Sequence, residues 1–446
     1  MILDFFYDVF LENATQIAVV YKNESVSYGF LNDRIKYWLS KLEGFEIRNG
    51  DVVALIGDFT PTTIALLFAL IENRNIIVPF DVQQANKIDK KKTIAGVSKT
   101  ITIVEEENVS FQNNPIKFKH PFYEKLKENR NPGLVLFTSG TSGEPKAAVH
   151  DLTKLLEKFR IRKRTYRTLN FLLFDHWGGL NTMFHTLSNG GVVLALNNRN
   201  PKSICEFIEK HKIELLPASP TFLNLLLLSE EYNNYDLSSL KLITYGTEPM
   251  PESTLQRIKT VFPKVKLQQT YGLIELGVMR SKSKDDGSLW VKVGGEGFQT
   301  RIVDSLLEIK ADSAMLGYLN APSPFTKDGW FMTGDQVEVD GEYIKILGRK
   351  SEIINVGGEK VYPAEVESTI LEMDNVLEVT VYPEKNPIMG NIVCAKVRLK
   401  DAEDKREFTK RLKIYCMKSI QSFKIPVKII IEETEQYNER FKKKRI

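Results

Sequence analysis

Short apolar runs alternate with helical patterns from the N-terminus to about Ser288. The run at residues 52–56 predicts a buried strand, followed by a helix over 62–72 and a second strand at 76–80. Similar runs, with helices between them, predict strands at 134–137, 171–174, 192–196 and 242–245. Strands that alternate with helices form parallel-rich sheets covered on both faces. The expected fold class is therefore α/β, with these elements in a large N-terminal domain.

The pattern changes after about Ser288, where strands become short and are separated by turns. They are expected at residues 290–293, 300–303, 307–310, 336–339 and 343–347. The dipeptide Asp340-Gly341 lies between two alternating runs and is a hairpin signal. We therefore predict that the large domain covers residues 1–348 and includes a small β subdomain at about 288–347.

The rest of the chain predicts a separate small domain over residues 352–446. Its pattern indicates, in order, a helix at 363–373, strands at 376–382 and 392–399, a helix at 405–418 and a strand near 428–432. This is an α+β unit. No Pro- or Ser-rich linker precedes it, so residues 349–351 are expected to act as a hinge on which the small domain moves.

Composition restricts the class of protein. The 446 residues are 42% hydrophobic and 26% charged, as in an ordinary soluble globular protein. Cys205, Cys394 and Cys416 share no short spacing, which excludes a zinc knuckle or a CxxC redox pair. The opening MILDFFYDVF lacks the basic segment of a signal peptide, and the apolar stretch at 62–71 is too short to cross a bilayer. We expect a cytoplasmic protein with reduced thiols and no transmembrane segment.

The distribution of charge is more informative than its sum. A net charge of +4 argues against a dedicated nucleic-acid binder. Residues 400–446 contain 14 basic and 8 acidic residues, a balance of +6, so the preceding residues carry −2. The excess ends in Phe441-Lys442-Lys443-Lys444-Arg445. A solvated end is the usual meaning of such a run.

The strongest chemical signal is the string TSGTSGEPK at residues 138–146, directly after an apolar strand. Glycines let a backbone approach an anion closely, N–H groups and hydroxyls surround phosphate oxygens, and a lysine adds a point charge. It is not a Walker A loop, because Glu144 and Pro145 separate Gly143 from Lys146. The residues expected to bind phosphate are Thr138, Ser139, Gly140, Thr141, Ser142, Gly143 and Lys146.

This string resembles the phosphate loop TSGTTGxPKG of the AMP-forming adenylating enzymes. That family comprises acyl- and aryl-CoA synthetases, nonribosomal-peptide adenylation domains and firefly luciferase. Here Ser142 replaces a Thr and Ala147 replaces the last Gly. Further motifs follow in the family's order. YGTEPMP at 245–251 resembles the adenine loop GGExLP, which implies nucleotide contacts by Gly246, Thr247, Glu248 and Pro249.

Two motifs resemble the family's metal and ribose contacts. YGLIE at 271–275 resembles YGxTE, which implies that Tyr271 and Gly272 lie by adenine and that Glu275 holds Mg²⁺; Ile274 replaces the family Thr. A carboxylate near a triphosphate is repulsive unless a hard cation lies between them. The string at 333–335 resembles TGD, whose Asp335 accepts both ribose hydroxyls, and Arg349 matches the GR that contacts ribose or phosphate.

The small domain continues the resemblance. GRKSEIINVGGEKVYPAEVE at 348–367 resembles GRxDDxIKxxGxxIxPxEIE, with Ser351 at the hinge position and Asn355 in place of a Lys. Gly357 and Gly358 then match the loop that approaches the thiol. At the end of the chain Lys442 matches the catalytic lysine of GKxxR. Phe441 replaces the Gly, and Lys443 or Lys444 remain alternatives for the lysine.

The acid pocket is expected around residues 174–181. His176, Gly179 and Leu180 fit the HxxGL of acyl and aryl enzymes, whereas Asp175 faintly resembles the Asp with which amino-acid activators hold an ammonium. We favour the acyl or aryl interpretation, because a buried aspartate needs a partner charge and His176 would provide one. The apolar residues Phe222, Leu223 and Leu226 are expected to pack a helix.

The resemblance implies activation of a fatty or aryl acid by ATP to an acyl-adenylate, with release of pyrophosphate. The acyl group then passes to coenzyme A or to the phosphopantetheine of an acyl carrier protein. Mg²⁺ is the expected cofactor, and no nucleic-acid partner is expected. The residues implied to be catalytic are Lys442, Glu275, Lys146 and His176.

Two other outcomes stay open. One is an amino-acid activator or a stand-alone acyl-AMP ligase. The other is a noncatalytic nucleotide-binding relative, which the departures at Ala147, Ile274, Asn355 and Phe441 motivate.

Overall fold

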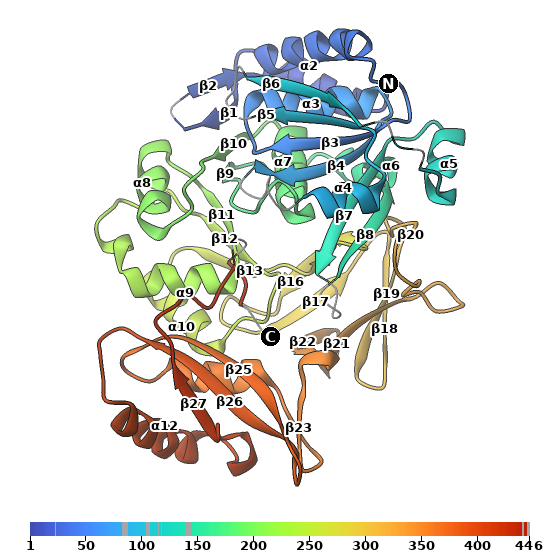
Figure 1. Cartoon of the computed structure of the whole chain (residues 1–446). Helices are drawn as coiled ribbons and strands as arrows, with labels where there is room; N and C mark the ends of the chain where they lie inside the picture. Colours follow the sequence, from blue (N-terminus) through green and yellow to red (C-terminus); the bar gives the residue numbers. More distant parts are fainter. Residues whose placement is uncertain are drawn as a thin grey trace.

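The computed structural model describes residues 1–22, 24–82, 88–103, 108–114, 116, 118–139, 144–438 and 441–443. Within these residues two seven-stranded sheets form most of the large domain (Figure 1). The first sheet has the order β20 (Gly317–Tyr318), β8 (Pro145–Asp151), β7 (Gly133–Ser139), β4 (Ile76–Asp81), β3 (Val52–Gly57), β5 (Lys99–Ile103) and β6 (Val109–Asn113). Its four central strands, β7, β4, β3 and β5, are parallel, and β20, β8 and β6 run antiparallel to their neighbours.

The second sheet is parallel except at one edge. Its order is β13 (Lys266–Gln269), β12 (Leu242–Tyr245), β11 (Leu215–Ala218), β9 (Arg167–Leu169), β10 (Val192–Ala195), β1 (Ile17–Tyr21) and β2 (Glu24–Ser27). Only β2 is antiparallel to its neighbour among these strands. The strand predicted at 171–174 is wrong: β9 ends at Leu169, and residues 171–174 form a buried loop. Their apolar side chains fill the core without pairing, a burial signal that periodicity does not distinguish from a strand.

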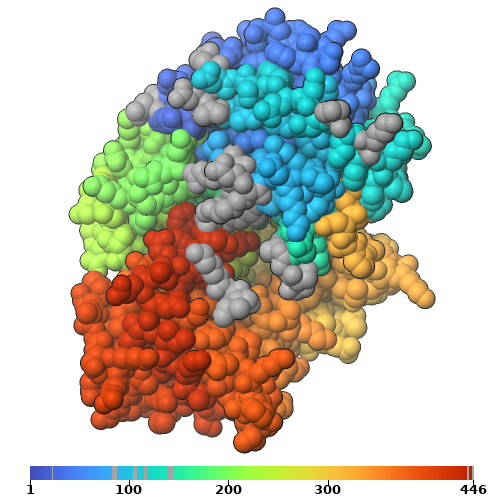
Figure 2. Space-filling view, in the orientation of Figure 1, coloured from blue at the N-terminus to red at the C-terminus, as the bar shows by residue number. Residues whose placement is uncertain are grey.

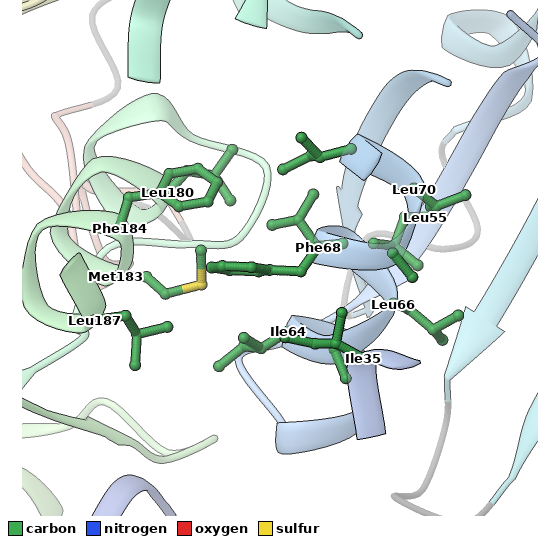
Figure 3. Close-up of a cluster of buried hydrophobic side chains, with 14 of the residues drawn as sticks. Ile35, Leu55, Ile64, Leu66, Phe68, Leu70, Leu180, Met183, Phe184 and Leu187 are labelled. Carbon is green, nitrogen blue, oxygen red and sulfur yellow. The ribbon is translucent and has the colours of Figure 1, made fainter. Parts of the chain in front are cut away.

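The main core lies between these two sheets. Helix α3 (Pro61–Glu72) is apolar on every side, and all its residues from 61 to 71 are buried, as expected of a helix enclosed by other elements. It begins where Thr60 Oγ1 accepts the N–H of Thr63 at 3.1 Å. Figure 3 shows Phe68 of α3 directed towards Met183 and Phe184 of helix α7 (Trp177–Ser188). Both sheets contribute strand residues to the same cluster.

Other helices cover the outer faces of the two sheets or connect the strands. They are α1 (Asp4–Glu12), α2 (Tyr28–Leu42), α4 (Asp89–Ala95), α5 (Pro121–Glu128), α6 (Leu152–Leu156), α8 (Pro201–His211), α9 (Pro220–Ser229) and α10 (Glu252–Val261). Phe222, Leu223 and Leu226 of α9 are fully buried in the core of the second sheet, so their expected packing role is confirmed. No described helix is long and apolar enough to cross a membrane.

A third sheet of six antiparallel strands follows in the chain. Its order is β16 (Arg280–Ser283), β17 (Trp290–Gly294), β22 (Tyr343–Arg349), β21 (Phe331–Asp340), β19 (Leu306–Ala311) and β18 (Phe298–Val303). The predicted hairpin at Asp340-Gly341 is confirmed, since Asp340 pairs with Tyr343 across it. The sheet begins at Arg280, before the predicted change of pattern at Ser288.

The last part of the chain forms a small unit with its own core (orange to red in Figure 1). One sheet in this unit contains β23 (Ile354–Val356), β24 (Glu359–Val361), β25 (Val376–Asn386), β26 (Gly390–Leu399) and β27 (Lys428–Ile431). The unit also contains the helices α11 (Pro363–Leu371) and α12 (Lys405–Ser419). The unit lies against α9 and α10 of the large domain (Figures 1 and 2). Asn224 Nδ2 donates to the carbonyl of Leu377 at 3.3 Å, and Ser253 Oγ donates to the carbonyl of Ser368 at the same distance.

Candidate active site

The TGD and GR motifs meet through strand pairing. Asp335 of β21 is the direct partner of Arg349 of β22, so their side chains share one face of the sheet. Arg349 Nε lies 3.4 Å from Asp335 Oδ1, and Tyr271 Oη donates to Oδ2 of the same carboxylate. The N–H of Asp335 donates to Thr333 Oγ1 at 3.0 Å, which orients the strand at this point. Three motifs that lie up to 78 positions apart in sequence thus converge on one carboxylate.

The electrostatics of this cluster suit recognition of hydroxyl groups. Burial raises the pKa of Asp335, and the Arg349 guanidinium and the Tyr271 hydroxyl oppose that rise. Burial, followed by the charge of Asp335, raises the pKa of Tyr271, so this phenol keeps its proton and donates it. A carboxylate accepts several hydrogen bonds at once, which is the chemistry needed to hold two neighbouring sugar hydroxyls.

Glu275 and Lys146 are brought together by a tyrosine. Glu275 follows the short strand β14 (Gly272–Leu273), which pairs with β15 (Gly277–Val278), and it is buried. Tyr318 Oη donates to Glu275 Oε1 at 2.6 Å, and Lys146 Nζ lies 5.6 Å from the centre of the Tyr318 ring. Burial raises the pKa of Tyr318, so its hydroxyl stays a donor at neutral pH. Sequence reasoning did not identify Tyr318, because Gly317-Tyr318 matches no chemical pattern by itself.

Strands β7 and β8 pair antiparallel at the two ends of the predicted phosphate-loop string. Thr138 pairs with Lys146 across it, whereas Gly140, Thr141, Ser142 and Gly143 lie outside the described residues. Ala147 donates its N–H to Asn320 Oδ1 at 3.0 Å, and Asn320 Nδ2 donates to the carbonyl of Pro145 at 2.9 Å. Asn320 therefore fixes the backbone on both sides of Lys146 at the start of β8.

The loop expected to contact adenine begins at the carboxyl end of β12. A Cβ on Gly246 would lie 2.5 Å from the carbonyl oxygen of Thr270, so only glycine fits there. Thr247 lies in the left-handed region with φ 75°. Glu248 faces the small domain: its Oε1 accepts the N–H of Thr221 at 2.9 Å and its Oε2 accepts the N–H of Lys443 at 3.4 Å.

The motif expected to form the acid pocket lies at the start of helix α7. His176 Nδ1 accepts the N–H of Gly178 at 3.0 Å and caps the helix, which in the neutral ring leaves the proton on Nε2. A Cβ on Gly179 would lie 2.4 Å from the carbonyl oxygen of Leu173, so the motif glycine permits close packing. His176 lines a cavity of about 300 Å³; the other lining residues are Phe171, Leu172, Leu173, Arg199, Thr247, Phe441 and Lys442.

Lys442 reaches this cavity from the small domain. Tyr437 and Lys443 pair as an antiparallel bridge. Asn438 holds Lys442, since its N–H donates to the Lys442 carbonyl at 2.9 Å and its Oδ1 accepts the Lys442 N–H at 3.1 Å. Lys443 accordingly lies between the two domains, since its N–H donates to Glu248 Oε2 of the large domain and its Nζ donates to Glu367 Oε2 of the small domain.

Arg199, which lines the cavity, belongs to a buried ion pair. Arg199 Nη2 lies 3.1 Å from Asp58 Oδ1 and 3.3 Å from Oδ2, and both side chains are 5% exposed. Asp58 follows β3 and Arg199 follows β10, so the pair joins the carboxyl ends of strands in different sheets. Sequence reasoning missed both residues. For Asp58, the available signal was a polar residue directly after a fully buried strand.

Comparison with known proteins places these features in a family. The family model described as AMP-binding enzyme matches residues 80–309, more than half of the chain, and the AMP-binding enzyme C-terminal domain matches residues 365–438. The chain belongs to the AMP-binding enzyme family. The resemblance to AMP-forming adenylating enzymes predicted from the motifs is thereby confirmed.

Curated relatives of this AMP-binding enzyme are ligases. Indoleacetate–CoA ligase of Aromatoleum aromaticum is 26% identical over 434 residues, which cover 85% of this chain and 84% of the relative. 2-Succinylbenzoate–CoA ligase of Listeria monocytogenes is 24% identical over 94% of this chain and 92% of its own length. The match to long-chain-fatty-acid–CoA ligase of Bacillus subtilis, at 26% identity, covers 79% of this chain and 66% of the relative.

Solved structures share the fold. The anthranilate CoA ligase AuaEII in complex with anthranoyl-AMP superposes with a TM-score of 0.83 at 16% identity, over 99% of this chain and 95% of that one. The o-succinylbenzoate CoA synthetase MenE from Bacillus subtilis gives 0.77 at 20% identity, over 99% and 97%. The predicted fold class, a large α/β domain followed by a small α+β domain, is confirmed.

The loop that the resemblance predicts to approach the thiol lies apart from Asp335 and Glu275. Gly357 and Gly358 form the turn between β23 and β24, with φ 59° and 94°, and both are exposed. Among the described contacts, none joins this turn to Asp335 or Glu275. The domain boundaries at 348–352 and the individual site roles stay predictions.

Proposed function

We propose that this AMP-binding enzyme is an acid–thiol ligase that activates a carboxylic acid with ATP and transfers the acyl group to coenzyme A. One observation carries the proposal: Lys442 of the small domain and His176 of the large domain line the same cavity. Thr247, from the loop expected to contact adenine, lines it too. An acid in this cavity would therefore meet the α-phosphate of a nucleotide next to a lysine.

The first step needs no general base. A carboxylic acid with a pKa near ~4 is ionised at neutral pH. Its oxygen attacks the α-phosphorus of ATP, the bond from that phosphorus to the bridging oxygen of pyrophosphate breaks, and pyrophosphate leaves. The enzyme contributes alignment and neutralisation of charge. Lys442 would hold the carboxylate against the α-phosphate, and Lys146 would bind the departing phosphates.

The residues around Glu275 fit Mg²⁺. This ion is commonly held by one or two carboxylates together with substrate phosphates. Glu275 supplies one carboxylate, which accepts the hydroxyl of Tyr318, and Lys146 lies over the ring of the same tyrosine. Within the described residues there is no group of three or more His, Cys, Asp or Glu side chains that would hold a metal ion without substrate phosphates. When bound, Mg²⁺ would neutralise charge on the phosphate oxygens.

The second step transfers the acyl group. A thiolate attacks the acyl carbon, the bond from that carbon to the phosphate oxygen breaks, and AMP leaves. Lys442 is in the cavity whereas Gly357 and Gly358 lie apart, so both motifs serve one site only if the small domain turns about residues 349–351 between the steps. We propose coenzyme A as the thiol because curated relatives are named CoA ligases; a carrier protein remains the alternative acceptor.

Two observations favour a plain acid over an amino acid. His176 lines the cavity, whereas Asp175 is not among the lining residues. An ammonium group would need a carboxylate in the cavity wall, whereas the charged residues that line it in the described part of the chain, Arg199 and Lys442, are cations.

Pyrophosphate release tests the proposal. Purified enzyme with ATP and Mg²⁺ is screened against fatty, aromatic, hydroxy and amino acids, with hydroxylamine to trap the acyl-adenylate and coenzyme A to detect the thioester. Lys442→Ala is expected to reduce acid-dependent release by roughly 100-fold or more, whereas the exposed Lys418→Ala, on α12, is expected to retain it. ATP binding without release with any acid would instead support the noncatalytic relative.

A further inference from the structure

Phe441 replaces the glycine of the family pattern, and its backbone has a conformation that favours glycine. Its backbone is left-handed, with φ 49°, a conformation in which glycine is free of strain and a bulky residue is not. The motif glycine of GKxxR stands at this position in the resembling family. A phenylalanine kept in such a conformation requires compensation from its surroundings.

The surroundings are aromatic and belong to both domains. The ring centre of Phe441 lies 5.4 Å from that of Phe171 and 5.4 Å from that of Phe222, both in the large domain. Tyr437, from the small domain, stacks on it at 5.4 Å with an interplanar angle of 19°. The Phe441 carbonyl also accepts Ser219 Oγ at 2.7 Å. Contacts of this kind fix the ring across the domain interface.

The same residue lines the cavity that His176 and Lys442 also line. The large domain supplies Phe171, Leu172 and Leu173 to this cavity, and the small domain supplies Phe441 beside the lysine. The space that these residues line is about 300 Å³, part of it open to solvent. It has to hold the carboxylate and part of the nucleotide as well as the remainder of the acid. Little room is left for a long chain.

We propose that Phe441 is a specificity-determining residue: it forms a wall of the acid pocket and restricts the adenylation step to short or compact acids. The inference rests on the proposed function, because it takes this cavity as the acid pocket. Since Phe441 precedes Lys442 directly, it takes its place in the wall when the lysine reaches the site. Selection by size therefore belongs to the first step, and turning of the small domain removes the wall before the thiol attacks.

The test compares Phe441→Gly, Phe441→Leu and the wild type on straight-chain acids from acetate to dodecanoate, with benzoate and phenylacetate as compact rings. The glycine variant also removes the left-handed strain, so loss of folding is not expected. The ratio of kcat/KM for decanoate to that for butyrate should rise by roughly tenfold or more in Phe441→Gly, with a smaller rise in Phe441→Leu. Tyr437→Leu, which removes the stacked ring and leaves the wall in place, controls for loosening of the chain end.

A second measurement starts from synthetic acyl-adenylates of both lengths and follows thioester formation with coenzyme A. In this assay the rate of thioester formation by Phe441→Gly should match that of the wild type for both acyl-adenylates. An equal fold-change for every acid in the first assay, or a length-dependent change in the second, would overturn the role of Phe441 and leave the proposed function intact. Absence of acid-dependent pyrophosphate release by the wild type would overturn the proposed function and this inference together.

Discussion

Lys443 Nζ lies 2.8 Å from Glu367 Oε2, and this ion pair joins the end of the chain to helix α11. Glu367 is 1% exposed and Lys443 is 17% exposed. The other carboxylate oxygen of Glu367 accepts the N–H of Val381 at 3.0 Å. Among the lysines proposed for catalysis, Lys443 is therefore engaged by Glu367 while its neighbour Lys442 lines the cavity. Lys444 lies outside the described residues.

This relationship predicts that Lys443 positions Lys442 without acting on the substrate. Lys443→Met removes the cation that lies against the buried Glu367 carboxylate, which should cost roughly 2–4 kcal/mol locally and loosen the chain end. Pyrophosphate release should fall while thioester formation from synthetic acyl-adenylate stays near wild type. Lys428→Met is the matched control, because its pair with Glu384 is about half exposed on both sides and contributes little. Equal losses in both steps would argue against a positioning role.

The buried pair of Arg199 and Asp58 predicts a stability effect. Arg199→Met should lower the free energy of unfolding by roughly 3–5 kcal/mol, because it leaves the Asp58 carboxylate buried without its cation. The double variant Asp58→Leu with Arg199→Met should recover much of that loss, since no charge is then left in the interior. Denaturant unfolding followed by circular dichroism measures both. An unchanged midpoint in Arg199→Met would contradict the importance of the pair.

The buried His150 and the half-buried His185 predict a loss of stability in mild acid. Burial lowers the pKa of His150 to about 4, and burial together with the charges of Lys163 and Lys158 lowers the pKa of His185 to about 4. In the unfolded chain each imidazole titrates near 6.5, so between pH 6.5 and 4 the unfolded state binds more protons. The contribution of these histidines to the free energy of unfolding should be fully present above pH 6.5. It should fall as the pH drops through this window, by about 3 kcal/mol per histidine.

Unfolding at several pH values measures this slope. The variant His150→Leu should show a shallower dependence between pH 6.5 and 4 than the wild type, whatever its stability at neutral pH. An identical slope in the two proteins would show that His150 already binds its proton in the folded state.

The convergence on Asp335 predicts a role in nucleotide affinity. Asp335→Asn keeps the size of the side chain but loses an ionised acceptor of hydrogen bonds, which is worth roughly 1.5–3 kcal/mol for a charged group. The KM for ATP should rise by roughly 10- to 100-fold, with a smaller change in the KM for the acid. Glu338→Gln, an exposed carboxylate on the same strand, is the control. A change confined to the KM of the acid would place Asp335 outside the nucleotide site.

Much of the fold followed from local pattern. The strand predicted at 242–245 matches β12 in both bounds, and the helix predicted at 62–72 differs from α3 by one residue. Both are marked by continuous apolar runs, and α3 has Thr60 and Pro61 at its start. The order of the motifs and their chemistry could also be predicted, because each motif is a contiguous string whose residue types indicate the groups that they bind.

What the sequence determined by itself is thus the set of elements, the family and the identity of the charged groups. Only the tertiary structure decided which groups meet. Tyr318 lies 43 positions from the Glu275 it contacts, Arg199 lies 141 positions from Asp58, and Lys443 lies 76 positions from Glu367. Each of these pairs depends on where separate elements pack. Local periodicity reports whether a residue is buried and not what buries it, which is also why the loop at 171–174 was taken for a strand.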